Sequence, residues 1–153
     1  MATRPLLVPG LSDAAQIVAD ASRKNYGRLA ELETYSKQPA YEELWDVWQQ
    51  CRQANWDGYD ALPVQQETYH NAYRLIEALP LGHTLPSVGA EPDGHLTLEW
   101  HRHPHWTLSV SVSPEGILHY AALLGIEDPR GSCPFFGEVP ESLLFLIRRV
   151  TRP

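Results

Sequence analysis

The sequence has little cysteine and no long hydrophobic run. Its two cysteines, Cys51 and Cys133, lie far apart, and neither belongs to a Cys-x-x-Cys motif. This excludes the disulfide framework of a small secreted domain and a cysteine-based zinc knuckle. The first ten residues contain only three consecutive apolar side chains, and no apolar run approaches the about 20 residues that span a membrane. We therefore expect a cytoplasmic protein with no membrane association.

Basic residues are also scarce. The 153 residues include 12 Lys and Arg against 19 Asp and Glu, so the formal net charge is −7. Negative charge repels nucleic acid and anionic membranes, whereas it attracts basic protein surfaces. The chain also lacks a phosphate-binding loop, a dinucleotide fingerprint and a Gly-x-Ser-x-Gly element. We therefore expect no direct nucleic-acid binding, no cofactor and no catalytic residue, and we expect a basic protein as the partner.

The N-terminal part of the chain has weaker signals than the rest. Residues 1–10 contain two prolines and a glycine and are typical of an arm, and helices with thin apolar stripes are predicted over about 12–22 and 26–35. We expect residues 1–37 to form this arm and these weak helices, and a homodimer formed through the helices stays an open alternative. Residues 38–153 are expected to form a single α+β domain, because five Trp, seven Tyr and three Phe supply anchors for one core.

Three stronger helical patterns follow. Apolar residues recur at three- and four-residue steps over about 41–55, which predicts an amphipathic helix with Trp45 and Trp48 in its apolar stripe. A second helix is predicted over about 63–79, and the two should form a hairpin. A third helix is predicted from Pro140. Its apolar stripe consists of Leu143, Leu144, Ile147 and Val150.

Between the second and third helices, the sequence predicts an antiparallel sheet. Pro-acid-Gly triplets at 92–94 and 114–116 are typical of three-residue hairpin loops. Even positions from 96 to 112 are largely apolar and odd positions are polar, so one face of the sheet is apolar. The predicted fold is α+β, a four-stranded antiparallel meander with helices packed on one face. Its strands are expected over about 86–91, 95–101, 105–113 and 117–124.

The turns also predict the register of the sheet. The first loop pairs Val88 with Leu98, and the last pairs Val110 with Tyr120. Symmetry in the middle hairpin pairs Trp100 with Trp106. All of these pairs place their side chains on the apolar face.

Histidines are concentrated in one predicted hairpin, where a carboxylate, Glu99, lies among them. They are His95, His101, His103 and His105. Neutral imidazoles with a carboxylate suit zinc or iron, so a metal-dependent hydrolase that uses the His-rich hairpin 95–105 is an alternative function. Pro104 and a tight turn interrupt the extended backbone where three of these histidines lie. We therefore assign no metal ligand.

The densest local signature is Asn55-Trp-Asp-Gly-Tyr-Asp-Ala-Leu-Pro63. We expect Asp57 to accept hydrogen bonds from backbone amides and Gly58 to adopt the left-handed conformation. Trp56 and Tyr59 are expected to anchor the turn to the core.

Together with a following helix and the strand end Glu99-Trp100, this element resembles a family of small uncharacterised bacterial proteins. Those proteins carry a Trp-Asp-Gly-Tyr-Gly-Ala-x-Pro element and are often encoded near mobile elements and toxin–antitoxin pairs, and the resemblance covers residues 41–150. Asp60 stands where the family commonly has glycine, and Gln65 stands where a serine helix cap is expected. No catalytic residue is assigned in that family, so the resemblance implies no activity.

Acidic charge without a catalytic motif predicts a non-enzymatic protein that binds another protein. We expect an inhibitor or regulator, antitoxin-like or anti-CRISPR-like, that occludes a basic, nucleic-acid-binding surface of its partner. Candidate contacts come from the acidic residues of the first part of the chain and from the exposed face of the sheet. The candidate partner-binding residues are Glu31, Glu33, Glu42, Glu43, Asp46, Asp57, Asp60, Glu99, His101 and His105.

Overall fold

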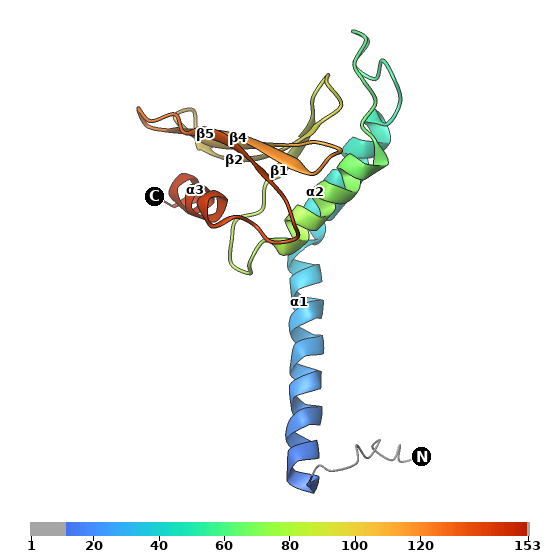
Figure 1. Ribbon diagram of the computed structural model, residues 1–153, viewed down its shortest axis with the longest axis vertical. Helices are drawn as coiled ribbons and strands as arrows, with labels where there is room; N and C mark the ends of the chain where they lie inside the picture. Colours follow the sequence, from blue (N-terminus) through green and yellow to red (C-terminus); the bar gives the residue numbers. More distant parts are fainter. Residues whose placement is uncertain (1–11, 153) are drawn as a thin grey trace. The chain divides into compact units, whose positions relative to one another are not determined.

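The computed structural model describes residues 12–152, apart from the side chains of residues 33 and 34. The predicted arm at residues 1–10 lies outside this range. Within it, the chain is α+β and has three helices and five strands, in the order α1, α2, β1 to β5, α3 (Figure 1). The chain divides into two compact units, Met1–Ser36 and Lys37–Pro153. Among the residues described, no helix has both the length and the apolar character needed to cross a membrane.

Helix α1 (Asp13–Cys51) contributes to both units and corrects the prediction of separate helices over 12–22, 26–35 and 41–55. Pro39, which lies between the second and third of these segments and would be expected to interrupt a helix, is accommodated inside α1. The helix ends earlier than predicted. The amide of Val64 donates to the carbonyl of Cys51 at 2.8 Å, and Asn55 already has a φ of 60°.

Helices α1 and α2 (Gln66–Ala78) form the predicted hairpin through stacked aromatic rings. Tyr41 of α1 stacks on Tyr73 of α2 with ring centroids 4.4 Å apart, and Trp48 stacks on Tyr69 at 4.7 Å. Lys37 also joins them, because its ammonium group donates to two carbonyl oxygens at the C-terminal end of α2, each at 2.6 Å. Such donation satisfies carbonyls that have no partner within their own helix.

The loop between α1 and α2 has the predicted conformation. The Asp57 carboxylate accepts hydrogen bonds from the amides of Tyr59 and Ala61 at 2.8 and 3.1 Å, and Gly58 has a φ of 78°. Asp60 has a φ of 64°, in the left-handed region that favours glycine. Trp56 is half-buried against the core, but Tyr59 is 88% exposed, so its predicted anchoring role is wrong.

The sheet is antiparallel and has the order β1-β2-β3-β4-β5. Its strands are β1 (Ser87–Ala90), β2 (Leu96–His103), β3 (Trp106–Val112), β4 (Ile117–Leu124) and β5 (Arg130–Pro134). The prediction of four strands is therefore wrong by one. The missed strand, β5, contains glycine and proline and shows no apolar alternation, and it forms by pairing with β4.

The register is as predicted at two of the three predicted hairpins. Val88 pairs with Leu98, and Val110 pairs with Tyr120. In the middle hairpin, Trp100 pairs with Leu108 and not with Trp106. A bulge between His101 and His103 and a short turn before Trp106 shift the register by two positions. Residues 96–101 keep their predicted faces, whereas His103, predicted on the polar face, pairs with Trp106.

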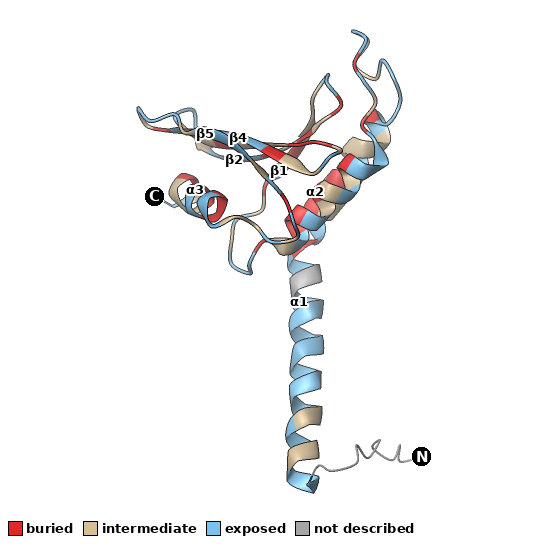
Figure 2. Ribbon diagram, in the orientation of Figure 1, coloured by how far each residue is buried: buried red, intermediate tan, exposed pale blue. Residues whose placement is uncertain are grey.

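The core lies where the apolar side chains of the sheet and the helices meet (Figure 2). In β2, β3 and the turn between them, the even-numbered residues from 96 to 112 are buried except for Arg102, Pro104 and Trp106, whereas no odd-numbered residue there is buried. Helix α3 (Glu141–Thr151) buries its predicted apolar stripe, and both α2 and α3 contact β2 and β3. The thiol of Cys51 is buried in this core.

Candidate functional site

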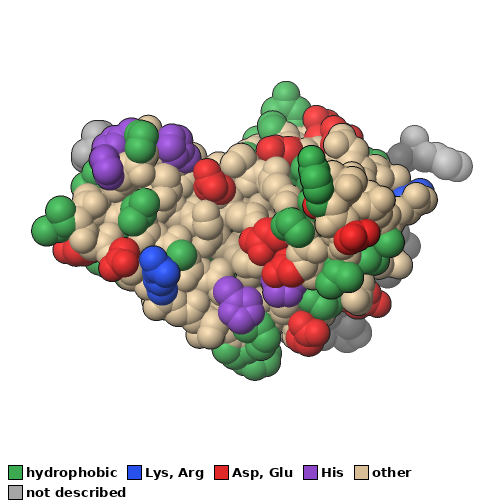
Figure 3. Space-filling model, turned by 90° about the horizontal axis from the view of Figure 1, so that it is seen from above, with side chains coloured by type: hydrophobic (Ala, Val, Ile, Leu, Met, Phe, Trp, Pro, Cys, Tyr) green, Lys and Arg blue, Asp and Glu red, His purple; other side chains and the backbone are tan. Residues whose placement is uncertain are grey.

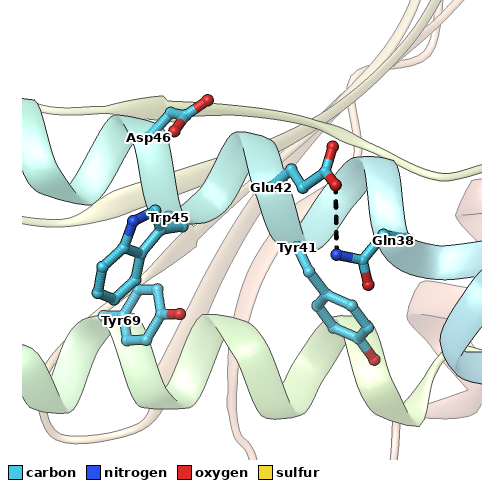
Figure 4. A pocket seen from close by; sticks show the side chains of 6 residues that line it. All are labelled: Gln38, Tyr41, Glu42, Trp45, Asp46 and Tyr69. Carbon is cyan, nitrogen blue, oxygen red and sulfur yellow. Dashed lines mark hydrogen bonds between the residues drawn. The ribbon is translucent and has the colours of Figure 1, made fainter.

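A pocket on the α1/α2 hairpin brings together two of the predicted partner-binding acids and several aromatic rings. Its volume is about 460 Å³, and we call it the Trp45 pocket. It is lined by Gln38, Tyr41, Glu42, Trp45 and Asp46 of α1 and by Tyr69 of α2 (Figure 4). Residues three and four apart share one face of a helix, which is why α1 presents these side chains together.

The aromatic wall of the pocket is the exposed end of a larger ring cluster. The Trp45 ring meets the edges of Trp48 and Tyr69, with centroids 5.7 and 5.9 Å away. Trp45 is 48% exposed. Trp48 is held more firmly, because its indole N–H donates to the carbonyl of Val64 at 3.0 Å. Trp48 therefore has a structural role, and Trp45 presents ring surface to solvent.

The polar side of the pocket carries negative charge. Figure 4 shows the carboxylates of Glu42 and Asp46 on the side of α1 away from α2, and Gln38 donates to Glu42 at 3.3 Å. Both acids are exposed, and within residues 12–152 neither forms an ion pair. Burial and the neighbouring Tyr73 raise the pKa of Tyr69, so this phenol stays protonated and uncharged at neutral pH.

A guanidinium group already contacts this ring cluster. Arg52 directly follows the end of α1, four residues after Trp48, and its guanidinium carbon is 5.9 Å from the centroid of the Trp48 ring. This distance is within the range of cation–π attraction. The cluster therefore has the electronic character to hold a cation, and the ring of Trp45 is still open to one.

The other predicted acids of the first part of the chain lie outside this pocket. Glu43 accepts a hydrogen bond from the amide of Val88 at 3.1 Å, and Asp57 holds the loop before α2. Asp60 is exposed in that loop. In the first unit, Glu31 is exposed and lines a separate pocket of about 450 Å³. Glu33 lies in α1, and its side chain is outside the described part of the structure.

The three predicted contacts in the sheet region, Glu99, His101 and His105, are exposed. Glu99 accepts a weak hydrogen bond from Ser109 at 3.3 Å on the polar face. None of the three lines the Trp45 pocket. On the face of the molecule in Figure 3, acidic side chains are more widespread than Lys and Arg, and histidines form two separate groups, at the upper left and near the lower middle.

The structure does not assemble the predicted histidines into a metal site. Within residues 12–152, the one group of three potential ligands with ligand atoms within 4.8 Å of one another is Glu91, Asp93 and His95. His95 and His101 are six positions apart along an extended chain, which separates them by about 20 Å. His95 instead bonds Ser111 at 3.1 Å.

The carboxylates of this hairpin group already have hydrogen-bond donors. Glu91 accepts from the hydroxyls of Thr97 and Ser111, and Asp93 accepts from the amide of His95 at 3.0 Å. The His95 ring lies parallel to that of His119, with centroids 6.1 Å apart. The group is therefore a hydrogen-bonded polar network on the sheet, and it is also the place where a metal ion would find three ligands.

Sequence reasoning missed Trp45 and Tyr69 as functional candidates because both fit the apolar stripes of their helices. A helical period indicates which side chains share a face, but it does not distinguish the centre of a stripe from its exposed edge. The acids at positions 42 and 46 mark Trp45 as an edge residue. Comparisons of the chain with protein-family models, with curated proteins and with solved structures found no match.

Proposed function

We propose that this protein is a non-enzymatic inhibitor or regulator that binds a basic protein partner. The observation that carries this proposal is the Trp45 pocket, which is lined both by exposed aromatic surface and by Glu42 and Asp46, two acids that form no ion pair with any described residue. Aromatic side chains and desolvated charges supply much of the binding energy at protein interfaces. An acidic and aromatic surface therefore fits a basic surface better than it fits nucleic acid or an anionic membrane.

The net charge of the chain supports the same proposal. A formal charge of −7 attracts a basic partner over a distance and accelerates its association. Covering a basic surface that contacts nucleic acid would inhibit the partner without any chemical step. The antitoxin-like or anti-CRISPR-like role belongs to this proposal and is its most specific form.

We also propose that α2 and α3 both pack on the apolar face of the sheet, so that the opposite face is free for a second contact. The contacts of both helices with β2 and β3 support this arrangement, as do their positions in Figure 1. Glu99 lies on that opposite face, at an odd-numbered position of β2. A partner that covers the acidic pocket and this face would be larger than a peptide.

The proposal is tested by capturing partners from a host lysate with the tagged protein and two charge-matched variants. Glu42→Gln/Asp46→Asn removes the pocket charges. Glu115→Gln/Glu138→Gln removes two exposed charges elsewhere. We expect one protein to be retained by the parent and the control but lost with the pocket variant. It should also be lost when ionic strength rises from about 0.1 M to about 1 M, which shortens the Debye length from about 10 to about 3 Å.

Two results would contradict the proposal. One is a lysate with no protein whose retention depends on both salt and the pocket acids. The other is a captured protein whose interacting surface is acidic or neutral, since electrostatic complementarity then has no part in recognition.

A metal-dependent hydrolase is the second proposal, and the Glu91, Asp93 and His95 group is the observation that favours it. Calorimetric titration of the protein with Zn²⁺ separates the two functions. Stoichiometric binding that is lost in His95→Ala, together with metal-dependent hydrolysis of an ester or phosphodiester, would favour the hydrolase. Absence of stoichiometric binding would remove it.

A further inference from the structure

We propose that the Trp45 pocket binds the guanidinium group of an arginine side chain on the basic partner. This inference rests on the proposed function and deepens it, because it names the chemical group that is recognised. The pocket volume of about 460 Å³ lies in the range of about 300–1,000 Å³ that is typical of ligand pockets. It therefore suits a side chain and not a folded segment.

The first argument concerns charge. Glu42 and Asp46 lie four positions apart on α1, on either side of Trp45 in the sequence, and neither carboxylate is paired with a cation of the described chain. Like charges one turn apart on a helix repel each other. A bound cation would relieve that repulsion, so the pocket favours a positively charged guest.

The second argument concerns the shape of the guest. The wall of the pocket consists of flat rings, and Trp45 presents about half of its surface to solvent. A guanidinium group is planar and weakly hydrated and stacks on aromatic faces, whereas an ammonium group is compact and strongly hydrated. The neighbouring contact between Arg52 and Trp48 shows the same pairing within this chain.

The third argument concerns hydrogen bonding. A guanidinium group has five N–H donors in a fixed plane and no acceptor. The carboxylates of Glu42 and Asp46 line the pocket on the side of α1 away from α2, and Gln38 adds an amide oxygen while its nitrogen is bonded to Glu42. An ammonium group has three donors that do not lie in one plane, so it cannot lie flat on an aromatic ring and donate to acceptors around the edge of that ring. The donor and acceptor numbers therefore favour arginine over lysine.

The test uses the full-length protein and three blocked five-residue peptides that differ only at the central position, which is arginine, lysine or citrulline. Citrulline keeps the planar shape of arginine but has no charge. Binding is followed through the indole N–H signals in ¹H–¹⁵N spectra, where the Trp45 signal is identified by its loss in Trp45→Phe. Because the Trp48, Trp56 and Trp100 indoles are each hydrogen-bonded to a carbonyl, their signals provide internal references.

We expect the Trp45 signal to shift with the arginine peptide, at an affinity roughly fivefold or more above that of the citrulline peptide and above that of the lysine peptide. Glu42→Gln/Asp46→Asn should abolish most of this preference, whereas Glu115→Gln/Glu138→Gln should retain it. Both variants change exposed side chains only, so we expect both to fold. Equal binding of arginine and citrulline, or shifts confined to other indoles, would overturn the inference.

The peptide and lysate experiments fail independently. If partner capture depends on the pocket acids but the Trp45 indole signal does not shift with the arginine peptide, the proposed function stands and the arginine inference is wrong. If the arginine peptide binds as expected but no captured protein depends on the pocket, the guanidinium site stands and the proposed function is wrong.

Discussion

The two neighbouring tryptophans of α1 should respond differently to substitution, because one holds the hairpin together and the other faces solvent. Trp48→Phe removes an indole N–H that bonds the carbonyl of Val64, a residue that is 1% exposed. Leaving a buried carbonyl without its donor costs about 1–3 kcal/mol. The phenyl ring keeps much of the stack with Tyr69. We therefore expect the free energy of unfolding to fall by about 1–3 kcal/mol in Trp48→Phe.

Trp45→Phe should cost less than about 1 kcal/mol, because Trp45 is 48% exposed and its ring meets those of Trp48 and Tyr69 edge to face and not in a stack. Urea unfolding followed by circular dichroism measures both values. A thermal scan should show a drop of about 2–4 °C for each kcal/mol in a chain of this size. If Trp45→Phe destabilises the protein as much as Trp48→Phe does, Trp45 is a core residue and the reasoning about an open pocket is refuted.

Three further predictions concern single side chains. Lys37→Met should lower the free energy of unfolding by about 1–3 kcal/mol in urea titrations, because it leaves two carbonyls at the end of α2 without their donor. An unchanged free energy would show that water replaces the ammonium group. Asp60→Val should cost about 1–2 kcal/mol because φ is 64° there, whereas Asp60→Gly should change stability by less than about 1 kcal/mol; equal effects would contradict a left-handed loop position. Burial raises the pKa of the Cys51 and Cys133 thiols above the ordinary value, so less thiolate is present at a given pH. We therefore expect iodoacetamide to react slowly near neutral pH and faster as pH rises past 9. Rapid alkylation at pH 7 would show that the thiols are not desolvated.

The sheet was the most predictable part of the fold where turn chemistry and alternation agreed. The Pro-acid-Gly loops set the pairs Val88 with Leu98 and Val110 with Tyr120, because glycine supplies the positive φ of each turn at Gly94 and Gly116. The middle hairpin has no such glycine, and its bulge is not encoded by any pattern of apolar residues. Its pairing was therefore wrong by two positions, and its faces were correct only as far as His101, because His103 pairs with Trp106.

Other features depend on tertiary structure and were not predictable from the local sequence. Strand β5 has weak strand character and exists because β4 offers a free edge. The continuity of α1 through Pro39 was not predictable for another reason, because proline usually interrupts a helix. In the candidate site, the acids at 42 and 46 were predicted, but the pocket also needs Tyr69, which only the packing of two helices places beside Trp45.

The capping role of Lys37 also shapes the electric potential outside the hairpin. Its ammonium group is directed into the protein, where it counteracts the negative pole of the α2 dipole. The ammonium group that directly precedes Gln38 in the chain therefore stays within the hairpin and does not line the Trp45 pocket. An incoming positive group can therefore reach Glu42 and Asp46 without displacing a lysine of this hairpin, and added electrolyte weakens its attraction to both carboxylates.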